Sequence, residues 1–210
     1  MGCVNRLKVL LVAGAVSSLA HGQSLQFQLQ GGLCELADSN WRRPADPHAP
    51  MREWPTTSEF LGLSGQSTAW DFGMEWALNP RHGVRLLYHR ASDGGGAFAN
   101  RQWALDWVWH LVRRGDRTFY TVGGFTLNQV EGTYEFHSGL LPPDGPGDYR
   151  VIAQSGRPGF KVGTGFQWSR HWAVEGAYHY ITLSTGGAQA TKDRATSYGA
   201  ILLSCRFGGQ

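Results

Sequence analysis

Beyond its first 22 residues, the sequence lacks any apolar run near the 18 or so residues that a membrane-spanning helix needs. It also lacks a strong excess of charge, because 19 Lys and Arg residues stand against 16 Asp and Glu residues. This balance gives no indication of nucleic-acid binding. If the chain enters a membrane after residue 22, it must do so with strands.

The sequence also lacks the motifs that hold metals, nucleotides and cofactors. It contains no metal-ligand spacing and no P-loop, and Gly94, Gly95 and Gly96 join two expected strands instead of opening a helix. We therefore expect no metal and no cofactor. Cysteine is scarce, with three residues in the whole chain.

The first 22 residues have the layout of a secretory signal peptide. Arg6 and Lys8 precede an apolar run over 9–16, and small residues follow over 17–22. We expect a signal peptide over 1–22 and a single mature domain over 23–210. Removing Arg6 and Lys8 leaves 17 basic against 16 acidic residues. No cysteine stands just after the apolar run, so a lipoprotein is not indicated.

The composition of the remaining chain favours strands. Glycine supplies 29 of 210 residues, and nine tryptophans and seven tyrosines accompany it. Glycine costs a helix interior about 1 kcal/mol relative to alanine, so helical proteins avoid a high glycine content. The composition predicts an all-β protein.

Apolar residues alternate along the expected strands, although the two faces of the segment 118–127 are less distinct. In the fourth, Trp103, Leu105, Trp107 and Trp109 alternate with smaller or polar residues. A helix through this segment would be apolar almost all round, so a strand is the better interpretation. The expected strands cover 25–33, 70–78, 84–89, 103–111, 118–127, 160–168, 174–180 and 196–207.

The expected connections alternate in length. Short turns follow the second, fourth and sixth strands, whereas most of the other connections are long, including 35–65 and 131–157. Transmembrane barrels have short periplasmic turns and longer extracellular loops. The sequence predicts that both termini lie on the short-turn side.

With these features, the chain resembles the small OmpA/OmpX-like outer-membrane barrels, a porin-family group of the Gram-negative cell envelope. Its last strand, Tyr198 to Phe207, is similar to the aromatic-ended terminal strand of that family, although Gly208, Gly209 and Gln210 follow it. The resemblance implies an eight-stranded antiparallel up-and-down transmembrane β-barrel in the bacterial outer membrane. It also implies contact with the barrel insertion machinery, outer-membrane lipid and lipopolysaccharide.

If the apolar faces contact lipid, each alternating strand assigns its residues to a side. The residues expected in the lumen include Gln26, Gln28, Gln30 and Gln167 and a polar network of Asp71, Glu75, Arg85, His89, Asp106, His110, Lys161, Glu175, His179 and Arg206. The aromatic residues expected to face lipid are Trp70, Phe72, Trp76, Trp103, Trp107, Trp109, Phe160, Phe166, Trp168, Tyr178 and Tyr180.

We expect the lumen network to be structural, because an eight-stranded barrel is just wide enough to be filled by its own side chains. The alternative is a proton path or catalytic cluster. Lipid A deacylases of the PagL type carry a His-x-Ser pair, but Ile181 follows His179 at that spacing, and no other histidine of the chain has a serine there. We therefore expect no enzyme activity; His137-Ser138 alone is too common a dipeptide to indicate an acyltransferase.

The sequence predicts a structural or surface-interaction protein of the outer membrane, with no wide pore. Loop clusters around Trp41-Arg42-Arg43 and Trp54-Pro55 are candidates for contact with lipopolysaccharide phosphates or a surface ligand. The main alternative is a soluble lipocalin-like barrel that binds an apolar ligand, with the indoles inside. Cys34 and Cys205 are expected to be free thiols on opposite faces, about seven residues out of register.

Overall fold

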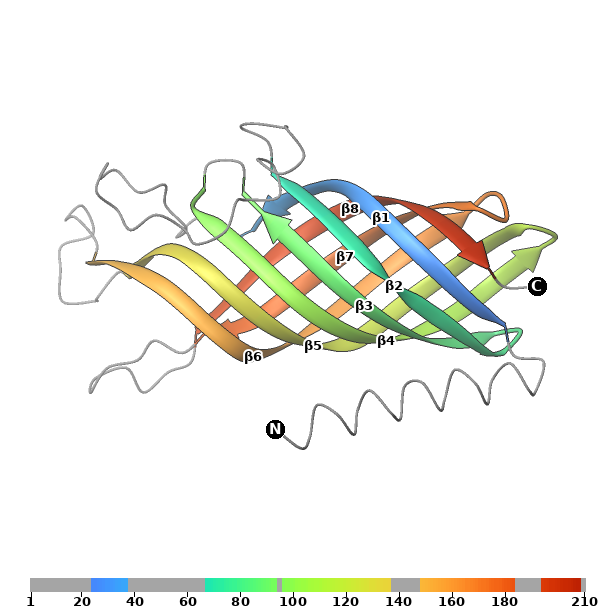
Figure 1. Cartoon of the computed structure of the whole chain (residues 1–210), viewed down its shortest axis with the longest axis horizontal. Coiled ribbons are helices and arrows are strands. Elements are labelled where there is room, and N and C mark those ends of the chain that lie inside the picture. The colour runs from blue at the N-terminus through green and yellow to red at the C-terminus, as the bar shows by residue number, and fades with distance from the viewer. Residues whose placement is uncertain (1–23, 38–66, 94–95, 137–147, 184–193, 209–210) are drawn as a thin grey trace.

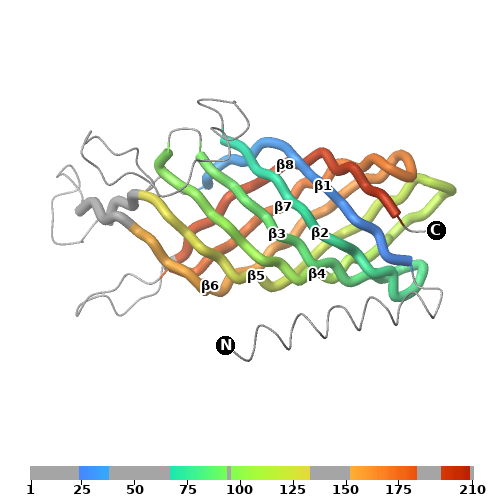
Figure 2. Tube along the Cα trace, viewed as in Figure 1, coloured from blue at the N-terminus to red at the C-terminus, as the bar shows by residue number. Residues whose placement is uncertain are grey.

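The computed structural model of the chain describes residues 24–37, 67–93, 96–136, 148–183 and 194–208. These form β1 (Leu25–Leu36), β2 (Thr68–Asn79), β3 (His82–Ser92), β4 (Phe98–Arg114), β5 (Arg117–Phe136), β6 (Asp148–Gln167), β7 (Trp172–Leu183) and β8 (Arg194–Gly208). Each strand pairs antiparallel with the next, and β8 pairs with β1 to close the barrel (Figures 1 and 2). The expected all-β, eight-stranded, up-and-down architecture is confirmed.

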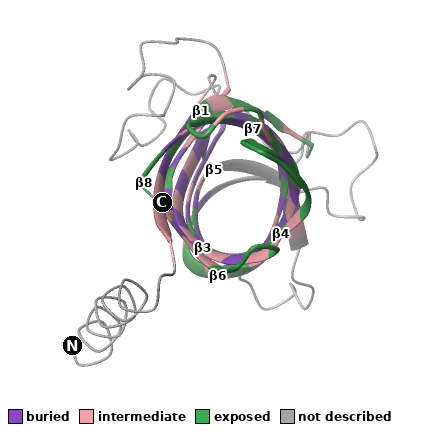
Figure 3. Cartoon of the chain, turned by 90° about the vertical axis from the view of Figure 1, so that its right-hand side faces the viewer, coloured by how far each residue is buried: buried purple, intermediate pink, exposed green. Residues whose placement is uncertain are grey.

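Alternation along the strands decides which side chains enter the lumen. In β4, Ala104, Asp106 and Val108 are buried, whereas Leu105 and Trp107 between them are 55% and 49% exposed. Successive side chains of a strand point to opposite faces, so this pattern identifies the inside and the outside of the wall. Figure 3, a view along the barrel, shows buried segments on the inner side of the ring. The helix considered for this segment is contradicted.

Local hydrogen bonds and one glycine form the short turns at the end where β8 finishes (Figure 1). The side-chain oxygen of Asn79 accepts hydrogen bonds from the backbone N–H groups of Arg81, at 2.8 Å, and His82, at 2.9 Å. Between β4 and β5, Gly115 has a φ of 60°, which fits the first central position of a type II′ hairpin turn. In the described part of the chain, no helix is long and apolar enough to cross a membrane.

The hairpin of β5 and β6 is longer than the sequence predicts. The expected connection over 131–157 is wrong in extent, because β5 continues to Phe136 and β6 begins at Asp148. Backbone pairing continues through a register irregularity near Asn128, where Gly156 adopts a φ of 68°. Glycine and proline near this point made the segment look like a loop. At the end opposite the short turns, these two strands extend beyond their neighbours (Figure 1).

The core of the protein is the lumen of the barrel. An apolar cluster lies toward its long-loop end, and a smaller one of Val108, Tyr120, Val122 and Ala173 lies toward the short turns. The members of the larger cluster are Cys34, Ala69, Ala91, Ala97, Phe98, Val130, Ile152, Ile181, Leu183, Tyr198, Ala200 and Leu202. Polar and charged side chains fill the space between these two clusters.

Candidate functional site

Several of the charged side chains of the lumen lie along one row of the strand register. Across β2, β3 and β4, Glu75 pairs with Arg85 and Arg85 pairs with Asp106. The row continues through Gly124 of β5 to Lys161 of β6. Opposite charges on directly paired positions stabilise a sheet, so the alternation of sign along this row is favourable.

Four of these charges form the centre of the network. Arg85 donates two hydrogen bonds to the Glu175 carboxylate, at 2.7 and 3.0 Å, and a third to Asp106 at 3.1 Å. Lys161 Nζ lies 3.0 Å from Glu175 and 3.2 Å from Asp106. All four side chains are buried. The two cations and two carboxylates balance each other, which is the condition for burying charge at low cost.

Two glycines make room for contacts that cross this network. Gly124 lies between Asp106 and Lys161 in the register, and an added Cβ there would collide with the Asp106 carboxylate. Gly165 lies between Tyr120 and Glu175 in the same way, and an added Cβ would meet the Tyr120 ring. Because Gly165 has no side chain, the Tyr120 hydroxyl reaches Glu175 at 3.2 Å.

Toward the short turns, a second group continues the network. His110 Nε2 lies 3.5 Å from the Glu75 carboxylate. The Arg206 guanidinium lies over the Tyr120 ring, 4.9 Å from its centre, and donates to the Gln167 side chain at 3.2 Å. Both contacts hold a buried cation without a direct carboxylate, since an aromatic face and an amide oxygen attract it.

Toward the long loops, the network consists of stacked aromatic rings, one carboxylate and one amide. His89 contacts Asp71 through Nδ1 and stacks on His179 with ring centres 4.5 Å apart. His179 stacks in turn on Tyr198 at 4.5 Å. Gln102 contacts Nδ1 of His179 at 3.1 Å.

All ten residues of the predicted polar network lie on the inner faces of their strands, together with Gln28, Gln30 and Gln167. Sequence reasoning omitted Tyr120, Tyr198, Asn100 and Gln102 from the network. Asn100 donates to the Tyr198 hydroxyl at 3.1 Å, and Gln102 contacts His179. Extending the alternation of β4 upstream of Trp103 would have found both amides, because they continue the Asp106 face.

The predicted outward aromatics all lie on the outer side of the wall, and several meet as pairs. Phe160 stacks on Tyr180 at 4.8 Å, and Trp107 donates its indole N–H to His82 at 3.1 Å. Trp168 lies just after β6, in the connection to β7. These side chains, with exposed leucines and valines between them, cover the exterior of the described barrel.

Several sequence predictions fall outside the described residues. These are the signal peptide over 1–22 and the loop clusters Trp41-Arg42-Arg43, Trp54-Pro55 and His137-Ser138. In the described residues, no group of three or more His, Cys, Asp and Glu side chains is arranged to hold a metal ion.

The prediction of free cysteines is confirmed, and the offset between them is corrected. Cys34 is buried in the lumen and Cys205 lies on the outer face, and both are free. Cys34 pairs with Ala200, five positions from Cys205 instead of the expected seven. At about 3.3 Å per residue the separation is still about 17 Å, far beyond the roughly 7 Å that a disulfide permits.

No family model and no curated protein matches the chain. Among solved structures, it is similar to the N-terminal β-barrel domain of Pseudomonas aeruginosa OprF, at 9% identity over 88% of this chain and 97% of that chain, with a TM-score of 0.44. For Neisserial surface protein A the values are 10% identity, 88% and 96% coverage and a TM-score of 0.45. Yersinia pestis Ail, in complex with the heparin analogue sucrose octasulfate, is 9% identical over 88% of this chain and 97% of that chain, with a TM-score of 0.38. At these values the likeness concerns the barrel alone.

The strand order, the closed register and the filled lumen stand independently of these comparisons. The chain is an all-β protein of eight antiparallel strands in a closed ring, an up-and-down β-barrel.

Proposed function

We propose that the protein is a bacterial outer-membrane β-barrel with a structural or surface-interaction role. It is exported with a cleaved signal peptide, is inserted by the barrel insertion machinery and has no catalytic activity. The long loops face the outside of the cell and the short turns face the periplasm, as in other transmembrane barrels.

The distribution of side chains between the two faces of the wall carries this proposal. Large apolar side chains are exposed on seven of the eight strands, with Phe125 at 83%, whereas Asp106, Arg85 and Glu175 are buried inside. A continuous apolar exterior of this size is unstable in water and favourable in lipid. A lipocalin-like barrel would need the opposite arrangement, with the indoles inside and these charges outside.

The filled lumen supports a structural role without a wide pore. Arg85, Lys161 and their two carboxylates occupy its centre, and the buried side chains of the larger apolar cluster lie toward its long-loop end. Partners are then expected at the surface, on the loops and in the surrounding lipid. A surface ligand would contact the loops between β1 and β2 or at the end of the β5–β6 hairpin.

Fractionation and gel mobility test the proposal. Expressed in a Gram-negative host, the full chain is expected in the outer-membrane fraction, to require detergent for extraction, and to migrate differently with and without boiling in SDS. A closed barrel resists SDS until it is heated because all its backbone groups are paired. Recovery in the soluble periplasmic fraction, with one mobility, would contradict the proposal.

A pair of leucine substitutions tests the lipid contact directly. Leu105 lies in the middle of the outer face of β4, whereas Leu78 lies beside the turn after β2. In a bilayer, Leu105→Arg is expected to cost about 2–4 kcal/mol and Leu78→Arg about 0–1 kcal/mol. Urea unfolding in phosphatidylcholine vesicles measures both. Equal small costs would show that the wall does not face lipid.

A further inference from the structure

The three short turns at the end where β8 finishes carry an excess of positive charge. Each turn contains at least one exposed arginine, and Asp116 is the only exposed acidic residue in these described segments. The exposed arginines are Arg81 between β2 and β3, Arg113, Arg114 and Arg117 around the turn between β4 and β5, and Arg170 between β6 and β7. This end of the described barrel therefore presents five arginines against one aspartate.

Two of these arginines lie on the outer side of the wall, just beyond its apolar band. Arg114 and Arg117 are direct partners across β4 and β5, and Val112 and Phe119, both exposed, are the next outward pair toward the barrel centre. Thr118 is buried, so its two neighbours Arg117 and Phe119 point outward. At about 3.3 Å per residue, the arginine pair stands about 7 Å beyond Phe119 along the strand. Among the described residues, neither arginine takes part in an ion pair.

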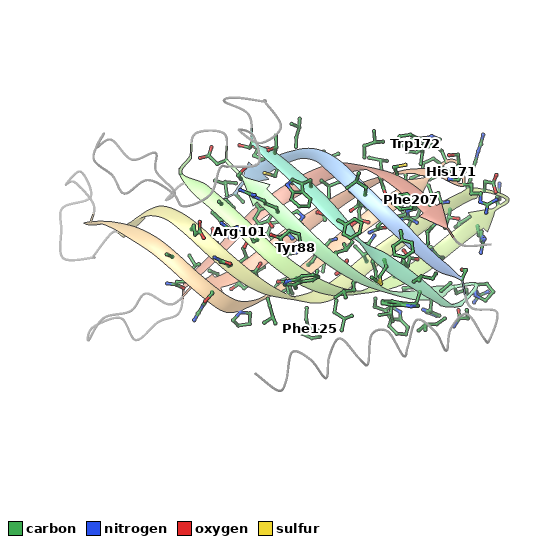
Figure 4. The ribbon with its side chains drawn as sticks, viewed as in Figure 1. Tyr88, Arg101, Phe125, His171, Trp172 and Phe207 are labelled. Carbon is green, nitrogen blue, oxygen red and sulfur yellow. The ribbon has the colours of Figure 1, made fainter. Side chains whose placement is uncertain are left out.

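Aromatic side chains lie on the outer face next to these turns. The His82 ring contacts the rings of Trp107 and Trp109, with centres 5.5 and 6.2 Å apart. Figure 4 shows Trp172 and Phe207, both exposed, at the same end of the barrel. In transmembrane barrels, girdles of aromatic residues mark the two membrane–water interfaces. The exposed arginines of the turns therefore lie on the headgroup side of such a girdle.

Headgroup phosphates are the anions that a bilayer offers at this level. Arginine binds phosphate with paired, charge-assisted hydrogen bonds. Basic residues beside a membrane surface attract anionic lipids. A zwitterionic headgroup brings a cation together with its phosphate, and the excess of positive charge on the turns disfavours that cation. A soluble acidic partner would not require the arginines to border an apolar, aromatic band.

We propose that the short-turn end of the barrel selects anionic phospholipids in the inner leaflet of the outer membrane, with Arg114 and Arg117 as the main contacts to the headgroup phosphate. Arg81 and Arg113 add to the positive potential around this site. The inference rests on the proposed function, because it needs the short turns to lie at the inner leaflet. It names the lipid chemistry that this end of the wall recognises.

Three variants separate charge from packing at this site. R114Q/R117Q removes both positive charges, whereas R114K/R117K, the matched control, keeps them. D116N removes the carboxylate that lies between the two arginines in the sequence. All three positions are exposed, so each variant is expected to form the same barrel.

The experiment uses the full mature chain in an alkyl maltoside detergent, which has no phosphate. Phosphatidylglycerol and phosphatidylcholine with the same acyl chains are titrated separately, and bound lipid is counted by native mass spectrometry. We expect the wild type to prefer phosphatidylglycerol and R114Q/R117Q to bind it about ten-fold less tightly, equivalent to about 1.4 kcal/mol. R114K/R117K should keep the preference, and D116N should bind phosphatidylglycerol more tightly than the wild type.

Two results would overturn the inference: no preference in the wild type, or an undiminished preference in R114Q/R117Q. Heat-dependent gel mobility of each variant shows whether it forms a barrel. If R114Q/R117Q does not, D116N decides the matter, since tighter binding supports the inference and unchanged binding overturns it. A protein that forms a barrel in the outer membrane but has no preference for the anionic lipid would leave the proposed function standing, whereas recovery in the soluble fraction would contradict both.

Discussion

Replacing Glu175 with glutamine removes one charge from the centre of the lumen while keeping the size of the side chain. Glu175 accepts hydrogen bonds from Arg85, Lys161 and Tyr120. The variant leaves Asp106 to balance both cations, through an oxygen that lies 3.1 Å from Arg85 and 3.2 Å from Lys161. One buried positive charge then has no counter-charge in the central group of four.

The expected loss of stability follows from this orphaned charge. Removing one partner of a buried ion pair costs about 3–5 kcal/mol, because the remaining charge stays desolvated without its compensation. With an m-value of about 2 kcal/mol per molar urea, a loss of about 4 kcal/mol lowers the unfolding midpoint by about 2 M.

Urea titration of the barrel in lipid vesicles, followed by gel mobility without boiling, measures this midpoint. The matched control is Glu35→Gln, which removes a carboxylate from an exposed position of β1. The double variant Glu175→Gln/Lys161→Met restores the balance between Arg85 and Asp106, so it should be more stable than Glu175→Gln alone. Equal midpoints for Glu175→Gln and Glu35→Gln would refute the idea that the network stabilises the barrel.

Two further predictions concern the glycine beside Tyr120 and the cysteines. Gly165→Ala places a methyl group against the buried Tyr120 ring, so we expect it to lower the free energy of unfolding by about 1–3 kcal/mol in the same urea titration. An added Cβ at Gly176 has nothing within 4 Å, so Gly176→Ala should be tolerated. Equal effects of the two substitutions would contradict the crowding at Gly165. Cys34 and Cys205 should both react with a thiol reagent after denaturation, even when the folded barrel has first been exposed to an oxidant. An intact mass lower by two hydrogens would reveal a disulfide and contradict the register.

Alternation predicted the two faces of the wall because successive side chains of a strand point to opposite faces. In this barrel the outer face is apolar, whereas the inner face carries the polar and charged side chains that fill the centre of the lumen. The positions of Arg85, Asp106, Lys161 and Glu175 in the lumen follow from their neighbours in sequence alone. The short turns were equally predictable, since Asn79 and Gly115 supply the local chemistry that those turns require.

The extent of the β5–β6 hairpin could not be predicted in this way. Its outer part contains Gly132, Gly156 and Pro158, which are typical of loops, yet it pairs as strand through backbone hydrogen bonds. The offset between Cys34 and Cys205 was also wrong by two positions, because the closing register between β1 and β8 depends on the whole ring.

The sequence by itself determined the class of fold, the number of strands and, in the strands with clear alternation, the side of the wall on which the side chains lie. The tertiary structure alone decided which charges meet. Arg85 and Glu175 lie 90 positions apart in the chain, and they touch because closure of the ring places β3 and β7 across the lumen from each other. The pairing of Arg90 with Arg101 likewise depends on the register of two strands, which is set by turns, bulges and closure of the barrel together and not by any local pattern.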